Sequence, residues 1–410
     1  MYRRIARVVF VLIGSAGSVL QAQEFQIFDR TVQVHGFVSQ GFVYTGGNNW
    51  LTMNTRSGSG AMTDMGLNVS SQVTDSLRLG AQVYDRNLGK LGQYHPSLDW
   101  ASVDYTFKPW LGVRGGKVKT TLGLYNDTQD LDFLRTFALL PQSVYPMDLR
   151  DTAIAHLGGD LYGAVPLKRQ LGAVSYTAYA GRRSDSIYSG FAYLLTQYQI
   201  YLRSLSGLQY GCDLRWETPL KGLLVGASRM NQGITGKGSF VNALKPSAGL
   251  LPYRISTTTD WTNQFYSQFS AGKLRLDAEY RRYVSDESYL PTVDVADDVR
   301  GWYVAGVYRV ARRLQVGSYY SRYTATSILT GPGAALIGSQ PDTSLPQNHI
   351  YDKAVAARLN LDRYWNVKLE GHFMDGVGVG VYPDGFYPQV NPGGFKPNTN
   401  ALIVRTGFAF

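Results

Sequence analysis

Apolar and polar residues alternate along most of the chain, with the period of two that is typical of β-strands. In the last ten residues, small side chains and Arg405 share one face. The opposite face is apolar and holds Leu402, Val404, Thr406, Phe408 and Phe410. An apolar strand at the exposed edge of a soluble sheet invites aggregation, whereas a closed barrel in a membrane turns that face to lipid. The pattern predicts an all-β protein, a transmembrane antiparallel β-barrel whose first strand, Val32–Thr45, pairs with Asn400–Phe410.

Short turns and longer polar connections alternate between the predicted strands. Seven short turns are expected at Thr74–Ser76, Lys108–Pro109, Pro166–Gln170, Pro219–Gly222, Ala271–Gly272, Ala311–Arg313 and Asp362–Arg363. Eight longer loops are expected at Gly46–Gly60, Asn87–Ser97, Thr120–Asp151, Ser184–Ser206, Gln232–Leu250, Asp286–Asp298, Thr326–Gln347 and Gly376–Thr399. These connections separate about sixteen strands and place both barrel termini on the short-turn, periplasmic side. Fourteen or eighteen strands stay open, because a sequence defines strand boundaries poorly.

The third long loop, Thr120–Asp151, differs from the others. It has about thirty residues, contains the apolar run Phe133–Leu140, and includes Pro141 and Pro146. Loops of this length within compact domains are usually functional or disordered. The apolar run requires a dry surface, so we expect the loop to fold into the lumen and narrow it near mid-height. A mobile loop on the outer surface is the alternative.

Composition favours one membrane barrel over several soluble domains. The length of 410 residues alone would suit two or three soluble domains. However, 29 Tyr and 45 Gly together with a mean hydropathy of −0.17 fit strands that alternate between lipid and water. After residue 20 no apolar run approaches the roughly 18 residues of a spanning helix. Residues 23–410 are therefore predicted to form a single domain.

The N-terminus is typical of a secretory signal peptide. Arg3, Arg4 and Arg7 precede an apolar stretch that begins at Val8, and cleavage is expected after Ala22, so that residues 1–22 are removed. A short membrane anchor is the alternative reading. The single cysteine in the sequence excludes an intrachain disulfide. Export combined with a barrel predicts the outer membrane of a Gram-negative bacterium, with its lipid as a partner.

Basic residues fall opposite the apolar face on many predicted strands. A charge that faces lipid at the membrane midplane costs about 2–4 kcal/mol, so we expect these side chains in the lumen. Near Arg114 the phase is expected to change at Gly115 and Gly116 through a β-bulge. The candidate pore-lining residues that attract anions are Arg78, Arg86, Arg114, Lys117, Lys119, Arg275, Arg281, Arg358, Lys368 and Arg405. Alternatively, they neutralise lumenal carboxylates at Asp104, Asp213, Glu217, Asp277, Glu279 and Glu370.

The sequence shows no known motif for catalysis or cofactor binding. It contains no G-x-S-x-G, no phosphate-binding glycine loop and no short histidine spacing typical of metal ligands. A Ser/His pair assembled from distant strands, as in a lipase, stays open. Asn126–Asp132 carries three carboxylates. Their spacing matches no calcium-binding loop, so we expect them to face basic side chains across a pore, and a calcium site is the less favoured alternative. We expect no catalytic residue, metal site or cofactor, and no nucleic-acid partner.

The segment from Arg114 to Tyr125, R-G-G-K-V-K-T-T-L-G-L-Y, resembles the entry to the constriction loop of the phosphate-selective porin family and its relatives. With the strand count, the long third loop and terminal Phe410, the chain resembles a Gram-negative trimeric porin. The resemblance implies passive diffusion of small, often anionic solutes through a basic constriction in a homotrimer. Thr121 replaces a usual proline and Tyr125 a usual acidic residue, which puts phosphate specificity in question. The candidate constriction-loop residues are Tyr125, Asp127, Asp130, Asp132, Arg135 and Tyr145.

The function expected from the sequence is a passive channel for small hydrophilic solutes, with a preference for anions. Rings of basic side chains in a narrow passage raise the local concentration of anions and repel cations. The alternative is a barrel with a plugged lumen whose external loops serve adhesion or receptor binding. Conductance in a planar bilayer separates the two.

Overall fold

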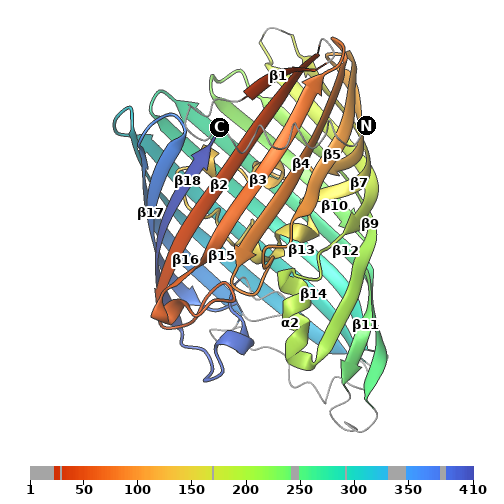
Figure 1. The fold of residues 1–410 in the computed structure, drawn as a ribbon, viewed down its shortest axis with the longest axis vertical. Coiled ribbons are helices and arrows are strands. Elements are labelled where there is room, and N and C mark those ends of the chain that lie inside the picture. Colours follow the sequence, from red (N-terminus) through yellow and green to blue (C-terminus); the bar gives the residue numbers. More distant parts are fainter. Residues whose placement is uncertain are drawn as a thin grey trace.

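The computed structural model describes residues 23–27, 30–168, 170–241, 249–290, 293–330, 348–378 and 385–410. The predicted signal peptide, residues 1–22, lies outside the described residues. Figure 1 shows strands that tilt around a common axis and enclose a lumen. Within the described ranges, no helix is long and apolar enough to cross a membrane.

One antiparallel sheet closes on itself to form the barrel. Its strands are β2 (Arg30–Gly46), β3 (Ser59–Gln72), β4 (Leu77–Leu88), β5 (Ser97–Lys108), β6 (Leu111–Lys119), β7 (Ala155–Pro166), β8 (Ala173–Ser184), β9 (Ile200–Glu217), β10 (Leu223–Gln232), β11 (Thr235–Val241), β12 (Leu250–Ala271), β13 (Leu274–Leu290), β14 (Val293–Arg309), β15 (Leu314–Thr330), β16 (His349–Asn360), β17 (Trp365–Gly376) and β18 (Asn398–Ala409). Because β10 and β11 follow each other between β9 and β12, they form one spanning strand. The described chain therefore makes a sixteen-stranded barrel, as predicted.

The barrel closes where the first spanning strand meets the last. β18 pairs with β2 from Asn400 opposite Gly46 to Ala409 opposite Phe37. Phe410 extends this ladder, because its N–H donates to the Gly36 carbonyl at 2.9 Å. The short strand β1 (Gln23–Ile27) then pairs with the first residues of β2 (Figure 1). The predicted pairing of the two chain ends is confirmed.

All seven predicted short turns connect neighbouring strands, but three long loops differ from the prediction. Most of Asp286–Asp298 belongs to β13 and β14, which pair as far as Leu290 opposite Val293. Gln232–Leu250 contains β11, and Ser184–Ser206 contains helix α2 (Gly190–Leu195) and the start of β9. The extension of β14 has a polar outer face, whereas Val293 and Val295 are buried on its inner face, so the pattern of a lipid-facing strand ends there. Residues 331–347 of the predicted loop Thr326–Gln347 lie outside the described residues.

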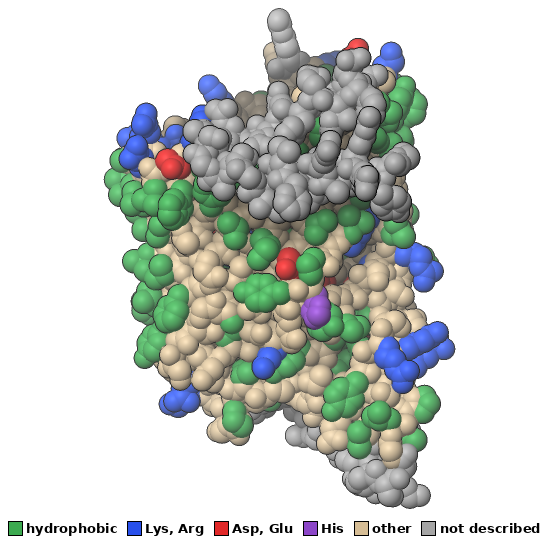
Figure 2. All heavy atoms as spheres, in the orientation of Figure 1, with side chains coloured by type: hydrophobic (Ala, Val, Ile, Leu, Met, Phe, Trp, Pro, Cys, Tyr) green, Lys and Arg blue, Asp and Glu red, His purple; other side chains and the backbone are tan. Residues whose placement is uncertain are grey.

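Side-chain exposure shows which face of the wall is the outer one. On β17, Leu369 and Phe373 are 51% and 54% exposed, whereas the alternating Lys368, Glu370 and His372 are fully buried. Figure 2 shows hydrophobic side chains spread over the outer surface of the wall. Near these residues the inner face is dry, because connections that enter the lumen pack against it.

The buried apolar clusters lie inside the barrel, between its wall and the connections that enter it. Short 3-10 helices punctuate these connections at η1 (Thr55–Ser57), η2 (Asn126–Thr128), η3 (Asp132–Leu134), η4 (Met147–Thr152), η5 (Thr196–Tyr198) and η7 (Pro388–Val390). Trp50 stacks on Phe386 with ring centroids 6.2 Å apart, which joins the first long loop to the last. Phe191 of α2 packs with Leu149 and with Ile255 of the wall. The interior is thus a packed core on the loop side.

Candidate functional site: the loop inside the barrel

Residues 120–154 connect β6 to β7 and are called the inner loop from here on. Its two ends are tied together by Asn126, whose amide nitrogen donates to the carbonyls of Thr120 at 2.7 Å and Ala153 at 2.8 Å. The Thr120 hydroxyl also lies 3.0 Å from His156 Nδ1 on β7. These contacts hold both ends of the inner loop at the same place on the wall, so the loop leaves the wall and returns to it between β6 and β7.

The apolar run of the inner loop packs on the inner wall. Phe137 and Leu140 are buried against Tyr303 of β14 and Tyr319 of β15, and the rings of Phe137 and Tyr319 lie 5.1 Å apart. Burying a side chain of this size contributes about 1.5–3 kcal/mol. Leu134 is the exception, since it is 60% exposed. The wall of the same chain therefore supplies the dry surface that the run requires.

Acidic residues of the inner loop make ion pairs with basic residues of the wall. Asp132 Oδ2 lies 3.2 Å from Lys368 Nζ on β17 and 3.1 Å from Arg405 Nε on β18. Burial alone would raise the pKa of Asp132, but Arg405 and Lys368 outweigh burial and hold it at about 2. Asp130 accepts hydrogen bonds from Lys119 Nζ at 2.6 Å and from the amide nitrogen of Gln82 at 2.5 Å.

These ion pairs send the loop carboxylates to different parts of the wall. Asp130 faces β4 and β6, whereas Asp132 faces β17 and β18. In the part of the chain that the structure describes, no three His, Cys, Asp or Glu side chains converge on a possible metal position. The acidic cluster that is contiguous in sequence thus serves as a set of separate anchors.

A second set of anchors surrounds the buried carboxylate of Glu279 on β13. It accepts hydrogen bonds from the Tyr145 hydroxyl at 2.7 Å, the Leu124 N–H at 3.0 Å and the Tyr303 hydroxyl at 2.5 Å. Nearby, the Tyr125 hydroxyl donates to Asp277 Oδ2 at 2.7 Å. Burial raises the pKa of both loop tyrosines, so they remain neutral donors. The inner loop is therefore fixed on opposite sides of the barrel.

A cavity of about 30 Å³, called the narrow cavity, lies between the inner loop and the wall strands β3, β4 and β18 and holds about two water molecules. Its charged lining consists of four arginines and two carboxylates, namely Arg86, Arg135, Arg150, Arg405, Asp64 and Asp130. Arg135 donates to the carbonyls of Thr128 and Gln129, each at 2.7 Å. Burial lowers the pKa of Arg135, but a guanidinium in a protein keeps its charge. The lining carries a formal excess of two positive charges.

Wider cavities lie on the short-turn side of the inner loop. One of about 450 Å³ is lined by residues that include Arg78, Arg114, Lys119, Asp127 and Arg215. Another of about 350 Å³ is lined by residues that include Tyr125, Leu134, Arg135, Arg275 and Arg309. Basic side chains predominate in both. On the short-turn side of the inner loop, the described interior thus widens into these two cavities, which are called the basic vestibules.

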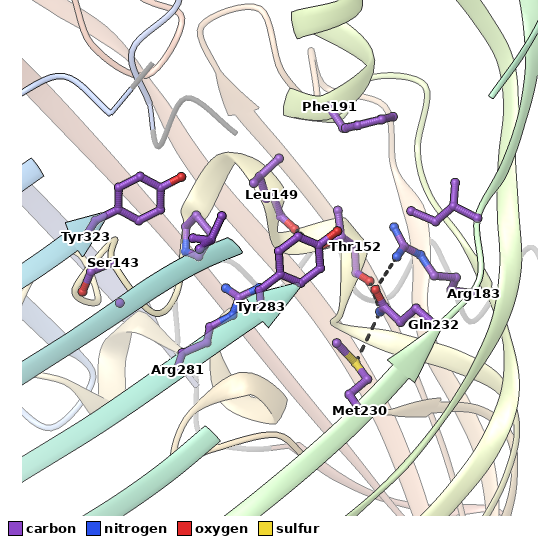
Figure 3. Close-up of a pocket in the computed structure, with 14 residues that line it drawn as sticks. Ser143, Leu149, Thr152, Arg183, Phe191, Met230, Gln232, Arg281, Tyr283 and Tyr323 are labelled. Atoms are coloured by element: carbon purple, nitrogen blue, oxygen red, sulfur yellow. Dashed lines mark hydrogen bonds between the residues drawn. The ribbon is translucent and has the colours of Figure 1, made fainter. Parts of the chain in front are cut away.

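On the long-loop side the cavity against the inner loop is small, about 40 Å³. Figure 3 shows Arg183 and Gln232 directed toward each other beneath Phe191, with Tyr283 and Arg281 on the facing strand. Arg183 Nη1 donates to the Gln232 side-chain oxygen at 2.6 Å. Arg281 Nη1 donates to the Val144 carbonyl of the inner loop at 3.1 Å. Helix α2 and the inner loop together leave little open volume here.

Eight of the ten candidate pore residues share the inward face of their strands with buried neighbours, namely Arg78, Arg86, Arg114, Arg275, Arg281, Arg358, Lys368 and Arg405. Most of these have a carboxylate close by. For example, Arg114 lies 3.1 Å from Asp160, Arg275 lies 3.1 Å from Asp277, and Arg86 lies 3.6 Å from Asp151. Partial neutralisation, the alternative considered from the sequence, accounts for much of the inward charge.

Lys117 does not face the lumen, in contrast to the prediction. It pairs with Ala101 and with Leu157, which is 62% exposed on the outer face, and its Nζ donates to the Leu98 carbonyl at 2.5 Å. The register runs without a shift from Gly112 to Lys119, so the expected bulge is absent. Regular alternation then puts Arg114 and Lys117 on opposite faces. Lys119 ends the strand and turns inward to Asp130.

The sequence analysis missed three residues of the narrow cavity, Tyr84, Asp64 and Arg150. Tyr84 precedes Arg86 by two residues, and Asp64 on β3 is the cross-strand partner of Arg86. Strand alternation alone would therefore have placed Tyr84 and Asp64 inside. Arg150 lies in η4, where no periodic pattern marks it. Its guanidinium lies 2.8 Å from Asp99 and 4.2 Å from the centroid of the Tyr84 ring.

Comparison with known proteins adds evidence on the fold. No protein-family model and no curated protein sequence matches the chain. Among solved structures, OmpT of Vibrio cholerae superposes with a TM-score of 0.55 at 12% identity and covers 95% of this chain and 100% of its own. The anion-selective porin of Comamonas acidovorans has a TM-score of 0.54 at 12% identity, with 93% and 100% covered. The chain has the fold of an outer-membrane porin.

Other porins superpose on the chain in the same way. OmpF of Salmonella typhi, solved in complex with daunomycin, has a TM-score of 0.52 at 12% identity and covers 95% of this chain and 100% of its own. Identities this low establish a common fold and nothing finer. The likeness of Arg114–Tyr125 to the phosphate-selective family remains a resemblance in sequence.

Proposed function

We propose that the protein is a passive outer-membrane channel for small hydrophilic solutes that prefers anions. The observation that carries this proposal is the inner loop, which crosses the barrel interior and leaves a narrow space lined by four arginines and two carboxylates. Solutes are sorted there by size and by the field of the fixed charges. No chemical step is required of any residue.

The charge distribution supports the anion preference. Both vestibules below the inner loop have more basic than acidic side chains, and the narrow cavity continues that excess. Fields from fixed charges are focused in a passage with low-dielectric walls, so a small excess raises anion occupancy. Arg114, Arg135 and Arg275 are each bonded to protein acceptors, which weakens the hold of each on a passing anion. A porin described as anion-selective shares this fold.

Assembly and location belong to the same proposal. One of the OmpT structures with this fold is described as a trimer form, and we infer a homotrimer here. β6, β7 and β8 have 9 to 12 residues, whereas β12 has 22, so the wall is low on one side and tall on the other. The low side is the part of the wall that we expect to make the contact with neighbouring subunits. Residues 1–22 would direct export to the outer membrane.

A plugged barrel is the second candidate, and the narrow cavity of about 30 Å³ favours it. In that case the external loops would bind a receptor or a surface, and the inner loop would serve only as a core. Planar-bilayer recording separates the two functions. We expect defined conductance steps from the parent protein and larger steps after deletion of Asp127–Tyr145. A silent parent that conducts only after the deletion would identify the plugged barrel.

A further inference from the structure

Three arginines and one carboxylate form a cluster on the outer face of the tall side of the barrel, called the arginine patch. Its members are Arg229 on β10, Arg282 on β13, Arg300 on β14 and Asp298 on β14. Arg282 pairs directly with Arg300 across the two strands, so their side chains emerge on the same face. That face also carries Tyr280 and Val304, which are 37% and 52% exposed. The patch therefore faces outward.

The patch lies at the border between apolar and polar positions of the outer wall. On β13 the outward residues from the short turn are Leu274, Leu276, Ala278 and Tyr280, and the next is Arg282. On β14 they are Tyr308, Gly306, Val304 and Trp302, and the next is Arg300. Aromatic residues followed by cations mark the boundary of the hydrocarbon region in membrane proteins. The arginines thus lie at the level of lipid head groups, on the long-loop side.

Contacts within the patch hold the guanidinium groups in fixed positions. Asp298 accepts bonds from Arg282 Nε and Nη2, both at 3.0 Å, and from Arg300 Nη2 at 2.9 Å. Arg229 and Arg282 both lie over the Trp261 ring, at 5.1 Å and 5.5 Å from its centroid. A rigid, pre-oriented guanidinium loses little entropy when it binds an oxyanion.

The patch retains positive charge and hydrogen-bond donors for a ligand. Three arginines against Asp298 leave a formal charge of +2, and the side chains of Arg282 and Arg300 are 41% and 54% exposed. A guanidinium carries five N–H donors, and the bonds to Asp298 use only Nε and Nη2 of each. Asp286, the nearest further outward carboxylate on β13, lies four residues beyond Arg282. An anion with several oxygens fits this surface.

We propose that the arginine patch binds the phosphate groups of an anionic membrane lipid in the outer leaflet, and so anchors the tall side of the barrel. Arginine forks match phosphate oxygens bidentately, and aromatic residues below them contact acyl chains. A second copy of the chain is the less favourable occupant. In the proposed trimer the low side of the wall makes the subunit contact, which leaves the tall side to lipid, and a two-fold contact would set this patch against itself so that like charges repel. The proposal depends on membrane insertion and is independent of conduction.

The test measures binding of diphosphorylated lipid A to the folded full-length barrel in detergent, by native mass spectrometry and by thermal stabilisation. Arg282→Gln combined with Arg300→Gln removes the centre of the patch. We expect affinity to fall about fivefold for each arginine, and so about twenty-fivefold in the double variant. Arg312→Gln combined with Arg313→Gln, in an exposed turn at the opposite end, is the matched control and should bind like the parent.

Two further arms keep the proposal open to refutation if the double variant folds poorly. Asp298→Asn removes the only carboxylate of the patch but keeps a side-chain oxygen that accepts from the arginines, so lipid A should bind more tightly than to the parent. Lipid A stripped of its phosphates should bind weakly to every variant. Equal affinity of parent and double variant, weaker binding by Asp298→Asn, or undiminished binding of the stripped lipid would each overturn the proposal. A change in oligomeric state without a change in lipid binding would assign the patch to a protein contact.

Discussion

Asp132 holds the inner loop through two buried cations, so Asp132→Asn should release part of that loop. Lys368 is fully buried and Arg405 is 3% exposed, and both lie within 3.2 Å of the Asp132 carboxylate. Removing one partner of a buried ion pair costs about 3–5 kcal/mol, because the other charge is left without compensation. Lys368 keeps the carbonyls of Asp132 and Phe137, and Arg405 keeps Asp64 and the carbonyl of Ala138, which favours the lower limit.

A cost of about 3 kcal/mol raises the undocked fraction of the segment around Phe133–Leu140 about a hundredfold. The barrel ladder does not pass through this segment, so the wall should remain closed and heat-modifiable on gels. The assay is limited proteolysis of the folded barrel, followed by recording of single channels. We expect new cleavage within Asp132–Leu140 and a larger, noisier conductance.

Asp127→Asn is the matched control, because Asp127 lies in the same loop and makes no ion pair among the described residues. It should leave the cleavage pattern unchanged. If Asp132→Asn and Asp127→Asn behaved alike, the buried pairs would not hold the loop. Loss of the folded barrel in Asp132→Asn would equally contradict the reasoning, since the wall would then depend on the loop.

Three other predictions concern acid, charge placement and closure. The pKa of Asp132 is about 2 in the folded protein, against an ordinary value of 3.8, so its ionised form stabilises the docked inner loop by about 2 kcal/mol. This stabilisation should be complete above about pH 4 and lost as the pH falls through 2. Proteolysis of the loop with an acid-active protease should show the loss in the parent and not in Asp132→Asn. Lys119→Glu should shift the reversal potential toward cation selectivity, whereas Lys117→Glu on the outer face should not; equal shifts would contradict the observed register. Deletion of Phe408–Phe410 should abolish folded barrel in membranes, and normal levels would refute the role of closure.

Strand alternation was sufficient to predict the wall of the barrel. A period of two in side-chain direction is a local property, so the inward position of Arg78, Arg275 and Arg405 followed from apolar neighbours in sequence. The same rule applied strictly would have put Lys117 outside. The error came from an assumed bulge at Gly115 and Gly116, where the actual ladder is continuous and only the φ of +127° at Gly116 is unusual.

The partners of the inner loop could not be predicted in the same way. Asp132 meets Lys368 and Arg405 across more than two hundred positions of sequence, and no local pattern encodes such a contact. Arg150 joins the narrow cavity through a 3-10 turn whose direction depends on Asp99 of the wall. The extent of β13 and β14 was also missed, because strands that rise above the lipid no longer have an apolar outer face, and their apolar residues, such as Val293 and Val295, point inward. Contacts between residues far apart in sequence therefore could not be predicted from local patterns.

The reversal potential across a tenfold KCl gradient reports the sign of the charge that controls permeation past the inner loop. We expect single channels whose reversal potential has the sign of an anion-preferring pore, set by the four arginines around the inner loop. Arg135→Glu combined with Lys119→Glu should move that potential toward the cation side. A cation-selective parent channel would show that these arginines do not control permeation.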